Sequence, residues 1–481
     1  MLVDGSKQTV AEQLERIGPF QFLSGQGDGG WTISTVAGTA QRRPPLPGFH
    51  GSILNEDEAQ IENLRQGGRR GPYGYQPGRE LMADLTQLRA EIDEGLRTRR
   101  FLDYWESSEW ASEATPVVDA IRDALAASPS AELLGLIERA VGHVIKVILR
   151  ADDSNGEIGG LAAELLESHG LACDAGVADP VKLARWMVRF TVDDQDFFVL
   201  DPKRYADALG ETGLAVYRKE IDRRRREGEQ PFALRYVDER LAVLDGDVDK
   251  IIRLLGGNLT SPYQFIQVTE AMVELGRDDD ALAWAQRGIA ETGGWQVAQL
   301  YDLAAGVYVR RGALGEVVAL RWDQHRRMTS STTYALLREA AEATGGWESE
   351  RSSARSVLEA EDLGGLVDAL LADGEPEAAW RVADDQPDWD PGRRRWKRLA
   401  ESRESSHPAD AMAVYFKLAD FELETTGRSS YTRAAALLKK ARRAADAAGR
   451  RGEFSEHLVA LREQFRKRPA LLEILDRSAL R

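Results

Sequence analysis

Apolar residues recur every three or four positions along most of the chain after residue 80, which is the spacing of one face of an α-helix. In the first such segment the apolar positions are Leu81, Leu85, Leu88, Ile92 and Leu96. Short breaks that carry Gly or Pro separate further segments of this kind, at about 100–110, 115–127, 130–150, 157–171, 180–192, 202–226 and 231–244. This part of the sequence has no alternating apolar and polar run that would indicate the strands of an α/β sheet. The pattern therefore predicts a helical domain over residues 79–240.

Two of these segments carry a sequence signal for a helix start. Thr115 precedes Pro116, and Asp179 precedes Pro180. A capping hydroxyl or carboxylate followed by proline in the first turn favours the beginning of a helix. We therefore expect helices to begin at Pro116 and at Pro180.

A longer pattern repeats beyond residue 240: an apolar helix, a glycine, an acidic or polar turn, and a second helix. The glycines of the four turns are Gly246, Gly276, Gly312 and Gly374. Their spacings are 30, 36 and 62 residues, and the last is close to two units of the same length. Periods of this length are typical of tetratricopeptide-like helix pairs, which stack because one pair cannot bury its apolar face alone. Residues 241–481 are therefore predicted to form a tetratricopeptide-like repeat domain, closed by the helix pair 412–425 and 431–448.

The first 78 residues differ from the rest of the chain. They are rich in Gly, Pro and Ser, with GQGDGG at 25–30 and RRPPLPG at 42–48. Such residues break helices and favour turns, and the run WTISTVAGT from Trp31 is compatible with one or two short strands. The chain is thus predicted to be all-α, an α-helical repeat (tetratricopeptide-like) solenoid with a Gly/Pro-rich, poorly regular N-terminal arm, residues 1–78.

Composition and charge narrow the class of protein. The 481 residues are 43% hydrophobic and 30% charged, with a formal net charge of −16. That charge repels nucleic acid and anionic membranes at long range and favours basic partners. No apolar run approaches the roughly 18 residues of a membrane helix, and the start, MLVDGSKQTVAEQ, lacks a signal-peptide pattern. Because Cys173 is the single cysteine, an intrachain disulfide and a cysteine zinc cage are excluded, and we expect a cytoplasmic protein.

Basic residues gather at residues 433–468 and at residues 223–226 despite the acidic average. The ordinary interpretation is a solvated helix face. The alternative is a nucleic-acid surface, in which phosphates would contact Arg442, Arg443, Arg466 and Lys467. Aromatic residues interleave with basic ones at Trp396 and Phe465, which fits either base stacking or the core face of an amphipathic helix.

Two motifs resemble ligand sites without their full pattern. Gly25, Gly27 and Gly30 match G-x-G-x-x-G but lead into a strand-like run, whereas a nucleotide site needs a helix there. The segment 152–158 resembles the centre of a calcium loop, with Asp153 and Asn155 as candidate metal ligands. Both outer anchors of that loop are missing, and a helix-capping turn explains the same residues.

No catalytic motif is present. H-E-x-x-H, G-x-S-x-G and G-x-x-x-x-G-K-[ST] do not occur, and the six histidines are scattered. His169 lies four residues before Cys173 on one helix face, which fits a thiolate pair, but a lone cysteine among Leu and Ala is more often a packing residue. We therefore predict no catalytic residues, no cofactor and no enzyme activity.

Several blocks together resemble the helical region that follows the zinc finger in bacterial SWIM zinc-finger proteins. These blocks are FLDYWESSEWASEATPVVDAIRDAL at 101–125, ADDSNGEIGGLAAELLESHGLAC at 151–173, DPVKLARWM at 179–187, RYADALGETGLAVYRKEI at 204–221, and the end of the chain from YTRAAALLKKARRA at 431. The family's C-x-C…C-x-H zinc motif is absent, so zinc binding does not carry over. The resemblance implies an all-helical repeat module whose partners include MoxR-type AAA+ ATPases or von Willebrand A-type proteins.

The sequence thus predicts a non-catalytic scaffold that binds protein partners and no membrane. Stacked helix pairs form grooves suited to a peptide or a partner helix. The candidate groove residues are Tyr263, Trp284, Tyr301, Tyr308 and Trp322, each of which also suits a core position. The alternative function is a nucleic-acid-associated protein that uses the basic C-terminal helices.

Overall fold

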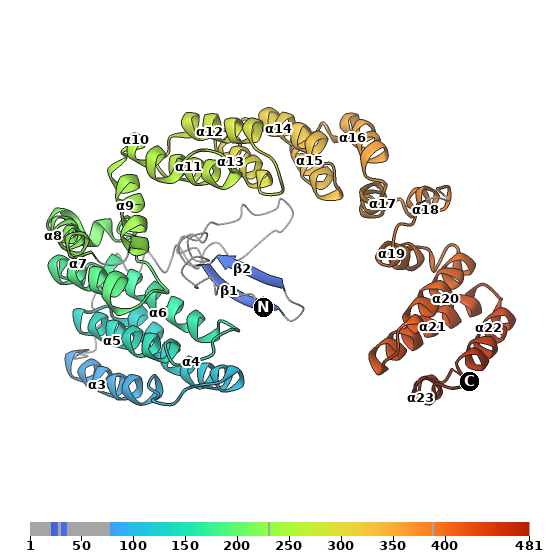
Figure 1. Ribbon diagram of the computed structural model, residues 1–481, viewed down its shortest axis with the longest axis horizontal. Helices are drawn as coiled ribbons and strands as arrows, with labels where there is room; N and C mark the ends of the chain where they lie inside the picture. Colours follow the sequence, from blue (N-terminus) through green and yellow to red (C-terminus); the bar gives the residue numbers. More distant parts are fainter. Residues whose placement is uncertain (1–20, 27–29, 36–76, 229–230, 387–388, 481) are drawn as a thin grey trace, which may run out of the picture. The chain divides into compact units, whose positions relative to one another are not determined.

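The computed structural model describes residues 21–26, 30–35, 77–228, 231–386 and 389–480 (Figure 1). The chain divides into two compact units, unit 1 at residues 1–257 and unit 2 at residues 258–481. The boundary expected at residue 240 falls inside a helix, α9 (Pro231–Asp245), whereas unit 1 extends to Gly257. Apart from two short strands, every regular element described is a helix.

The two strands form an antiparallel hairpin within the N-terminal arm. Strand β1 (Gln21–Gln26) pairs with β2 (Gly30–Thr35), so that Gln21 lies opposite Thr35 and Gln26 opposite Gly30. The strand suggested from Trp31 is therefore β2. Gly25 and Gly30 lie in the strands, Gly27 lies outside the described residues, and a strand rather than a helix follows the motif. The remainder of the predicted arm, up to residue 76, also lies outside the described residues.

Unit 1 is a helical domain built around one core. Its buried residues form a continuous cluster that runs from Leu85 to Leu241, as expected when helices pack their apolar stripes against one another. Its helices are α3 (Pro77–Gly95), α4 (Tyr104–Ala127), α5 (Ala131–Ile148), α6 (Glu157–Asp174), α7 (Pro180–Val188), α8 (Ala206–Glu227), α9 and α10 (Val248–Ile251), with π-helical segments η1 (Arg189–Asp194) and η2 (Ile252–Gly256).

The expected helix start at Pro116 is wrong. Helix α4 begins at Tyr104, where Asp103 caps the backbone N–H groups of Trp105 and Glu106, and Pro116 lies inside the helix. A proline there leaves the carbonyl of the residue four positions earlier without its helical donor. That residue is the exposed Ser112, whose carbonyl water can solvate, so the helix continues.

The expected start at Pro180 is confirmed. Helix α7 begins at Pro180, and the Asp179 carboxylate accepts hydrogen bonds from the backbone N–H groups of Val181 and Lys182 at 3.0 and 2.9 Å. Proline in the first turn loses no helical hydrogen bond, because that N–H has no partner inside the helix.

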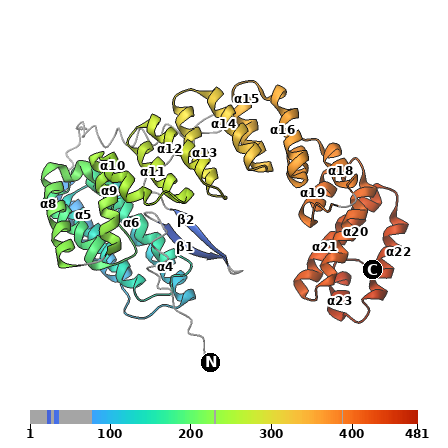
Figure 2. The ribbon, with the colours of Figure 1, turned by 45° about the horizontal axis from the view of Figure 1, so that its top comes forward.

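Unit 2 is a succession of helices that follow one another in chain order (Figures 1 and 2). Each helix from α11 to α21 contacts the next one along the chain, α23 contacts α21, and α11 contacts α13, α15 contacts α17, and α17 contacts α19. The helices are α11 (Pro262–Glu274), α12 (Asp278–Glu291), α13 (Val297–Arg310), α14 (Leu314–Arg327), α15 (Ser331–Ala343), α16 (Trp347–Glu361), α17 (Leu363–Ala372), α18 (Pro376–Asp384), α19 (Arg393–Arg403), α20 (Pro408–Glu424), α21 (Arg428–Ala447), α22 (Arg451–Gln464) and α23 (Pro469–Arg477).

Glycines with positive φ end the first helix of successive pairs. Gly276, Gly312 and Gly374 have φ values of 68°, 68° and 77°, which only glycine adopts without strain. The long interval before Gly374 contains Gly345, with φ of 72°, so it holds two units as the spacing indicated. At each turn the backbone N–H of the residue after the glycine donates a hydrogen bond to a carbonyl of the preceding helix, as the Glu375 N–H does to the Leu370 carbonyl at 2.9 Å.

The core of unit 2 is divided among several clusters along the helix stack. One joins Phe265 to Tyr301, another joins Tyr334 to Leu399, and a third runs from Ala400 to Leu480. Clusters shared only between neighbours are the mark of a repeat architecture. The predicted all-α helical-repeat fold is confirmed, but the pair α20 and α21 does not close the array, because α22 and α23 both pack on α21. Among the described helices none is both long and apolar enough to span a bilayer.

Candidate functional site

A cavity of about 770 Å³ lies in unit 2 against helices α15, α17 and α19. These three helices contact one another in sequence, α15 with α17 and α17 with α19, so the cavity belongs to one layer of the repeat. Its volume is within the range of about 300–1,000 Å³ that ligand pockets have. Charged side chains dominate its lining, namely Arg338, Asp368, Asp373, Arg393, Arg394, Arg395 and Arg398. We call it the arginine cavity.

Helix α15 presents a tyrosine and an arginine to the arginine cavity. Its start is fixed by a capping box, in which the Ser330 hydroxyl accepts from the Thr333 N–H at 3.2 Å and the Thr333 hydroxyl accepts from the Ser330 N–H at 3.1 Å. Tyr334 and Arg338 are four residues apart and therefore lie on one face of the helix. Both reach the same acceptor, Asp373.

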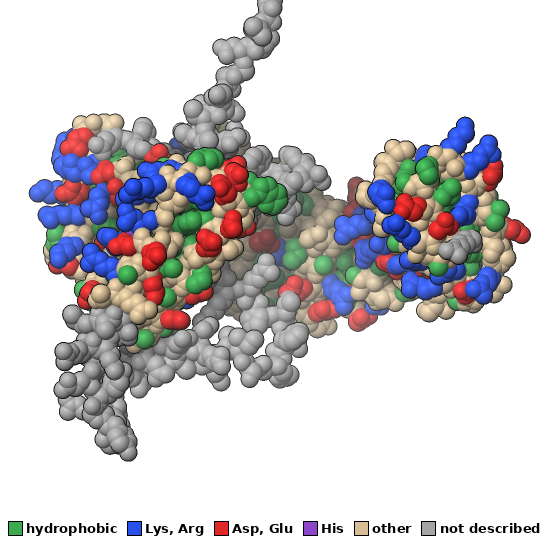
Figure 3. Space-filling view, turned by 90° about the horizontal axis from the view of Figure 1, so that it is seen from below, with side chains coloured by type: hydrophobic (Ala, Val, Ile, Leu, Met, Phe, Trp, Pro, Cys, Tyr) green, Lys and Arg blue, Asp and Glu red, His purple; other side chains and the backbone are tan. Residues whose placement is uncertain are grey.

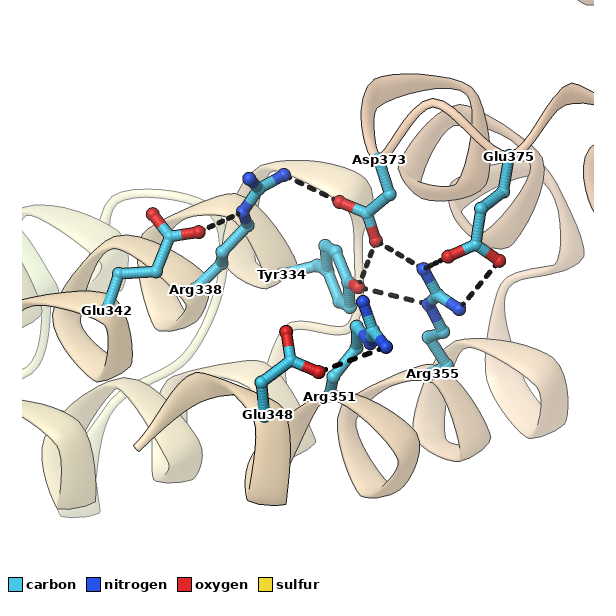
Figure 4. A network of polar contacts seen from close by, with 8 residues as sticks. All are labelled: Tyr334, Arg338, Glu342, Glu348, Arg351, Arg355, Asp373 and Glu375. Carbon is cyan, nitrogen blue, oxygen red and sulfur yellow. Dashed lines mark hydrogen bonds and ion pairs between the residues drawn. The ribbon is translucent and has the colours of Figure 1, made fainter. Parts of the chain in front are cut away.

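The Asp373 carboxylate is the centre of a polar network that connects α15, α16 and the turn after α17 (Figure 4). Its oxygens accept hydrogen bonds of 2.6 Å from the Tyr334 hydroxyl, from Arg338 Nη1 and from Arg355 Nη2. Arg355 also donates to both carboxylate oxygens of Glu375, at 2.7 and 3.1 Å. With only 5% of its side chain exposed, Asp373 holds together three donors, of which Arg338 is the most exposed at 37%.

The charges of this network shift one another's pKa values. Burial raises the pKa of Asp373, but the hydrogen bonds from Tyr334 and Arg355 lower it more, so it lies below the ordinary value. Burial, then the bond to Asp373, raises the pKa of Tyr334 to about 12. The hydrogen bond from Arg355 lowers the pKa of Glu375. Near neutral pH the five side chains Tyr334, Arg338, Arg355, Asp373 and Glu375 are therefore two carboxylates, two guanidinium groups and a neutral phenol, and Arg338 Nε also donates to Glu342 at 2.7 Å.

A second carboxylate in the lining of the arginine cavity, Asp368, holds two arginines of α19. Arg395 Nε donates to Asp368 Oδ2 at 2.9 Å, and Arg398 pairs with the other oxygen. Arg395 lies close against α17 because Gly364 has no side chain: a Cβ there would be 2.7 Å from the Arg395 guanidinium carbon. One carboxylate thus compensates two guanidinium groups.

Two further arginines of α19 have no carboxylate partner among the described residues. Arg393 and Arg394 are both exposed, and the Arg393 guanidinium lies 4.5 Å from the centre of the Phe421 ring. The start of α19 is preceded by Gly392, and no side chain caps the free N–H groups of its first turn. The arginine cavity therefore has an excess of positive charge, to which a helix N-terminus adds.

The five predicted partner-binding aromatics lie within or against the core. Tyr301 is fully buried and its hydroxyl donates to Asp323. Trp284 packs against the cluster of Phe265 and Tyr301, and Trp322 donates from Nε1 to Glu350 Oε2 at 2.9 Å. Tyr263 and Tyr308 are half-buried. These are contacts of packing residues, and a partner surface formed by the five stays a prediction.

The basic residues of the nucleic-acid alternative are partly occupied by internal contacts. Arg442 donates to the Ala479 carbonyl at 2.9 Å, and Arg466 pairs with Glu463, whereas Arg443 and Lys467 are exposed. The C-terminal helices, on the right in Figure 3, show basic side chains mixed with acidic and apolar ones. Residues 223–225 are likewise paired with neighbouring carboxylates. These contacts favour solvated helix faces.

The candidate metal ligands act as a helix cap. The two oxygens of Asp153 accept from the backbone N–H groups of Ile158 and Gly159 at 2.9 and 2.8 Å, at the start of α6. Asn155 donates to the Ser108 hydroxyl at 2.6 Å. Across the described residues, no three His, Cys, Asp or Glu side chains are grouped as metal ligands.

Cys173 is buried, and its Sγ lies 3.9 Å from His169 Nδ1. The same His169 nitrogen is 3.0 Å from the Tyr205 hydroxyl, and the imidazole stacks on Trp186 with ring centres 4.1 Å apart. Burial raises the pKa of the Cys173 thiol to about 12, whereas a nucleophilic cysteine needs a lowered value.

We therefore expect Cys173 to react with a thiol reagent such as Ellman's reagent only when the protein unfolds. Near pH 8 the folded chain should show almost no reaction, because the thiolate is scarce and the sulfur is buried. The unfolded chain should release one equivalent of chromophore. Rapid reaction of the folded chain would instead support a nucleophilic role.

Sequence reasoning missed the arginine cavity although part of its signal was present. The run that contains Arg393, Arg394, Arg395 and Arg398 surrounds Trp396, which packs edge-on against Trp380 with ring centres 5.6 Å apart. In the sequence, Asp373 is only the residue before Gly374 in one of the repeat turns. A count of charges in residues 391–398 would have indicated a basic surface, but not its carboxylate partners.

Comparisons with known proteins identify a family for this chain but no function. The family model described as "Family of unknown function (DUF6880)" matches residues 202–471. No curated protein matches the chain significantly. A solved structure of the human IFIT1 dimer with PPP-AAAA is 12% identical with a TM-score of 0.26, over 83% of this chain and 99% of that chain. A circular tandem repeat protein with novel repeat topology is 13% identical with a TM-score of 0.16, over 83% of this chain and 91% of that chain. TM-scores this low give no basis for transferring a function.

Proposed function

Because the chain belongs to the DUF6880 family, whose function is unknown, we propose its function from its own architecture: a non-catalytic scaffold that binds partner proteins through the helical repeats of unit 2. The observation that carries the proposal is the stack of helix pairs in unit 2, whose layer of α15, α17 and α19 contains the arginine cavity. Repeats of this kind expose an extended binding surface, because each pair buries apolar area only against its neighbours.

The charge arrangement supports protein binding over nucleic-acid binding. The chain is acidic overall, which opposes the long-range attraction that nucleic-acid binding uses. Two residues of the nucleic-acid alternative, Arg442 and Arg466, have internal partners. The resemblance to SWIM zinc-finger proteins makes MoxR-type ATPases and von Willebrand A-type proteins the first partners to test.

The test is a cross-linking pull-down with the full-length protein from extracts of its own source. We expect a reproducible partner whose cross-links fall in residues 258–481, and we expect the same pair when the partner serves as bait. The control is the extract treated with nuclease. Loss of the partner on that treatment would favour the nucleic-acid alternative, and cross-links confined to residues 77–257, or no partner at all, would overturn the proposal.

A further inference from the structure

We infer that the arginine cavity binds an acidic peptide segment of the partner protein. The carboxylates of that segment contact Arg393 and Arg394, which have no carboxylate partner among the described residues, and the free N–H groups at the start of α19. This rests on the proposed function, because the ligand is taken to be part of a bound protein. It goes further by assigning the site and the chemistry of what occupies it.

The local charge of the arginine cavity favours an anionic ligand. The arginine cavity is lined by five arginines and two carboxylates. Asp368 pairs with Arg395 and Arg398 together, and Asp373 is shared by Arg338 and by Arg355 of α16. Arg338 also pairs with Glu342 and Arg355 with Glu375, so the excess lies with the arginines of α19. Such an excess of positive charge opposes the compact state unless an anion compensates it. In a chain whose net charge is −16, this concentration is a local feature rather than an effect of composition.

The hydrogen-bond donors of the arginine cavity suit carboxylates. Arg393 and Arg394 open α19, next to the uncapped N–H groups of its first turn. Guanidinium groups bind carboxylates through two parallel hydrogen bonds, and a helix N-terminus favours the same charge. Elsewhere in the lining, Asp368 fixes the orientation of the Arg395 guanidinium and Asp373 fixes that of Arg338. Several carboxylates on one segment can therefore be received together.

The lining of the arginine cavity does not suit a nucleobase. Single-stranded nucleic acids combine phosphate contacts with bases stacked on aromatic rings. The aromatic residue in the lining is Tyr334, which is 2% exposed and whose hydroxyl is bonded to Asp373. Its ring offers no open face, so the lining supplies anion contacts without a stacking surface. An acidic peptide needs only such anion contacts, whereas an oligonucleotide also needs a stacking surface for its bases.

The experiment measures the fluorescence anisotropy of a labelled short peptide of alternating Glu, Asp, Gly and Ser with the full-length protein. The same peptide with Gln and Asn in place of the acids is the ligand control, and a single-stranded oligonucleotide and inorganic phosphate are the competitors. We expect binding of the acidic peptide alone, weakening as salt rises, and no displacement by the oligonucleotide. Inorganic phosphate should displace the peptide only at high concentration.

The protein variants test the site. Arg394→Glu should weaken peptide binding roughly tenfold, because it removes a charge-assisted contact and adds a repulsion. Lys397→Glu is the matched control: Lys397 is exposed on the same helix but outside the lining, so affinity should stay within about twofold. Gly364→Ala keeps every charge and displaces the Arg395 guanidinium, so a smaller loss is expected. Circular dichroism confirms that each variant is folded.

Other outcomes would overturn the inference. Equal losses for Arg394→Glu and Lys397→Glu would mean non-specific attraction, and tight displacement by phosphate or the oligonucleotide would mean a different ligand. If Arg393→Glu with Arg394→Glu leaves the partner's cross-links in residues 258–481 unchanged, the arginine cavity fails while the scaffold proposal stands. Peptide binding that depends on Arg394, with no partner recovered from extract, would reject the scaffold and keep the site.

Discussion

Replacement of Asp373 by alanine is expected to lower the free energy of unfolding of unit 2 by about 3 kcal/mol, since removing one member of a buried ion pair costs roughly 3–5 kcal/mol. The Asp373 carboxylate accepts from Tyr334, Arg338 and Arg355 and is nearly inaccessible to water. The substitution removes this acceptor from the Tyr334 hydroxyl and from the guanidinium groups of Arg338 and Arg355. Glu375 still pairs with Arg355, Glu342 still pairs with Arg338, and Arg338 is 37% exposed, which places the estimate at the low end.

The loss should depend on pH in a defined direction. The pKa of Asp373 is lower in the folded chain than the ordinary value, which is about 3.9 in an unfolded chain. Its contribution is therefore fully present above that unfolded value and is lost as pH falls through the lower folded value. The difference in stability between the parent protein and Asp373→Asn should be large at neutral pH and shrink in strong acid.

Urea unfolding followed by tryptophan fluorescence and circular dichroism, at several pH values, measures both effects. Asp385→Asn is the control, because Asp385 is an exposed carboxylate at the end of α18, and its change should stay within about 0.5 kcal/mol. A cost for Asp373→Ala below about 1 kcal/mol, or a difference independent of pH, would show that the network contributes little to stability.

The sequence predicts the repeat well because its signals are local. A helix that ends in a left-handed turn needs glycine at one position, so Gly276, Gly312 and Gly374 could be recognised without knowledge of the fold. Gly345 was implied only by the length of the interval that contains it. Pro116 misled the prediction because its cost depends on whether the Ser112 carbonyl reaches water, which the sequence does not encode locally.

The arginine cavity was not predictable from the sequence for a different physical reason. Its ion pairs join residues far apart in the chain: Arg355 and Asp373 are 18 positions apart, and Arg398 and Asp368 are 30 apart. Each pair forms only when helices stack at one particular offset. The sequence shows a basic run and a turn, and only the packing of α15, α17 and α19 brings them to one cavity.

Alanine substitutions at two helix-interior glycines of unit 2 are expected to change stability in opposite directions. At Gly288 of α12, a Cβ would lie 2.7 Å from Leu300 Cδ1 and from Phe265 Cβ, both in fully buried side chains. Overpacking a core costs about 1–3 kcal/mol, which outweighs the helix gain. At Gly306 of α13 no atom lies within 4 Å of the added Cβ, so Gly306→Ala should stabilise by about 0.5–1 kcal/mol.

Thermal and urea unfolding of the two variants measure this contrast, and a third variant identifies its cause. In a Leu300→Ala background, Gly288→Ala should cost less than in the parent, because one of the two crowding groups is gone and residues in contact are not additive. Phe265 Cβ is attached directly to the backbone and cannot rotate away, so part of the cost should remain. The stack of helix pairs on which the scaffold depends requires this close approach of α11, α12 and α13. Equal stabilisation by Gly288→Ala and Gly306→Ala would mean that these helices do not pack as described.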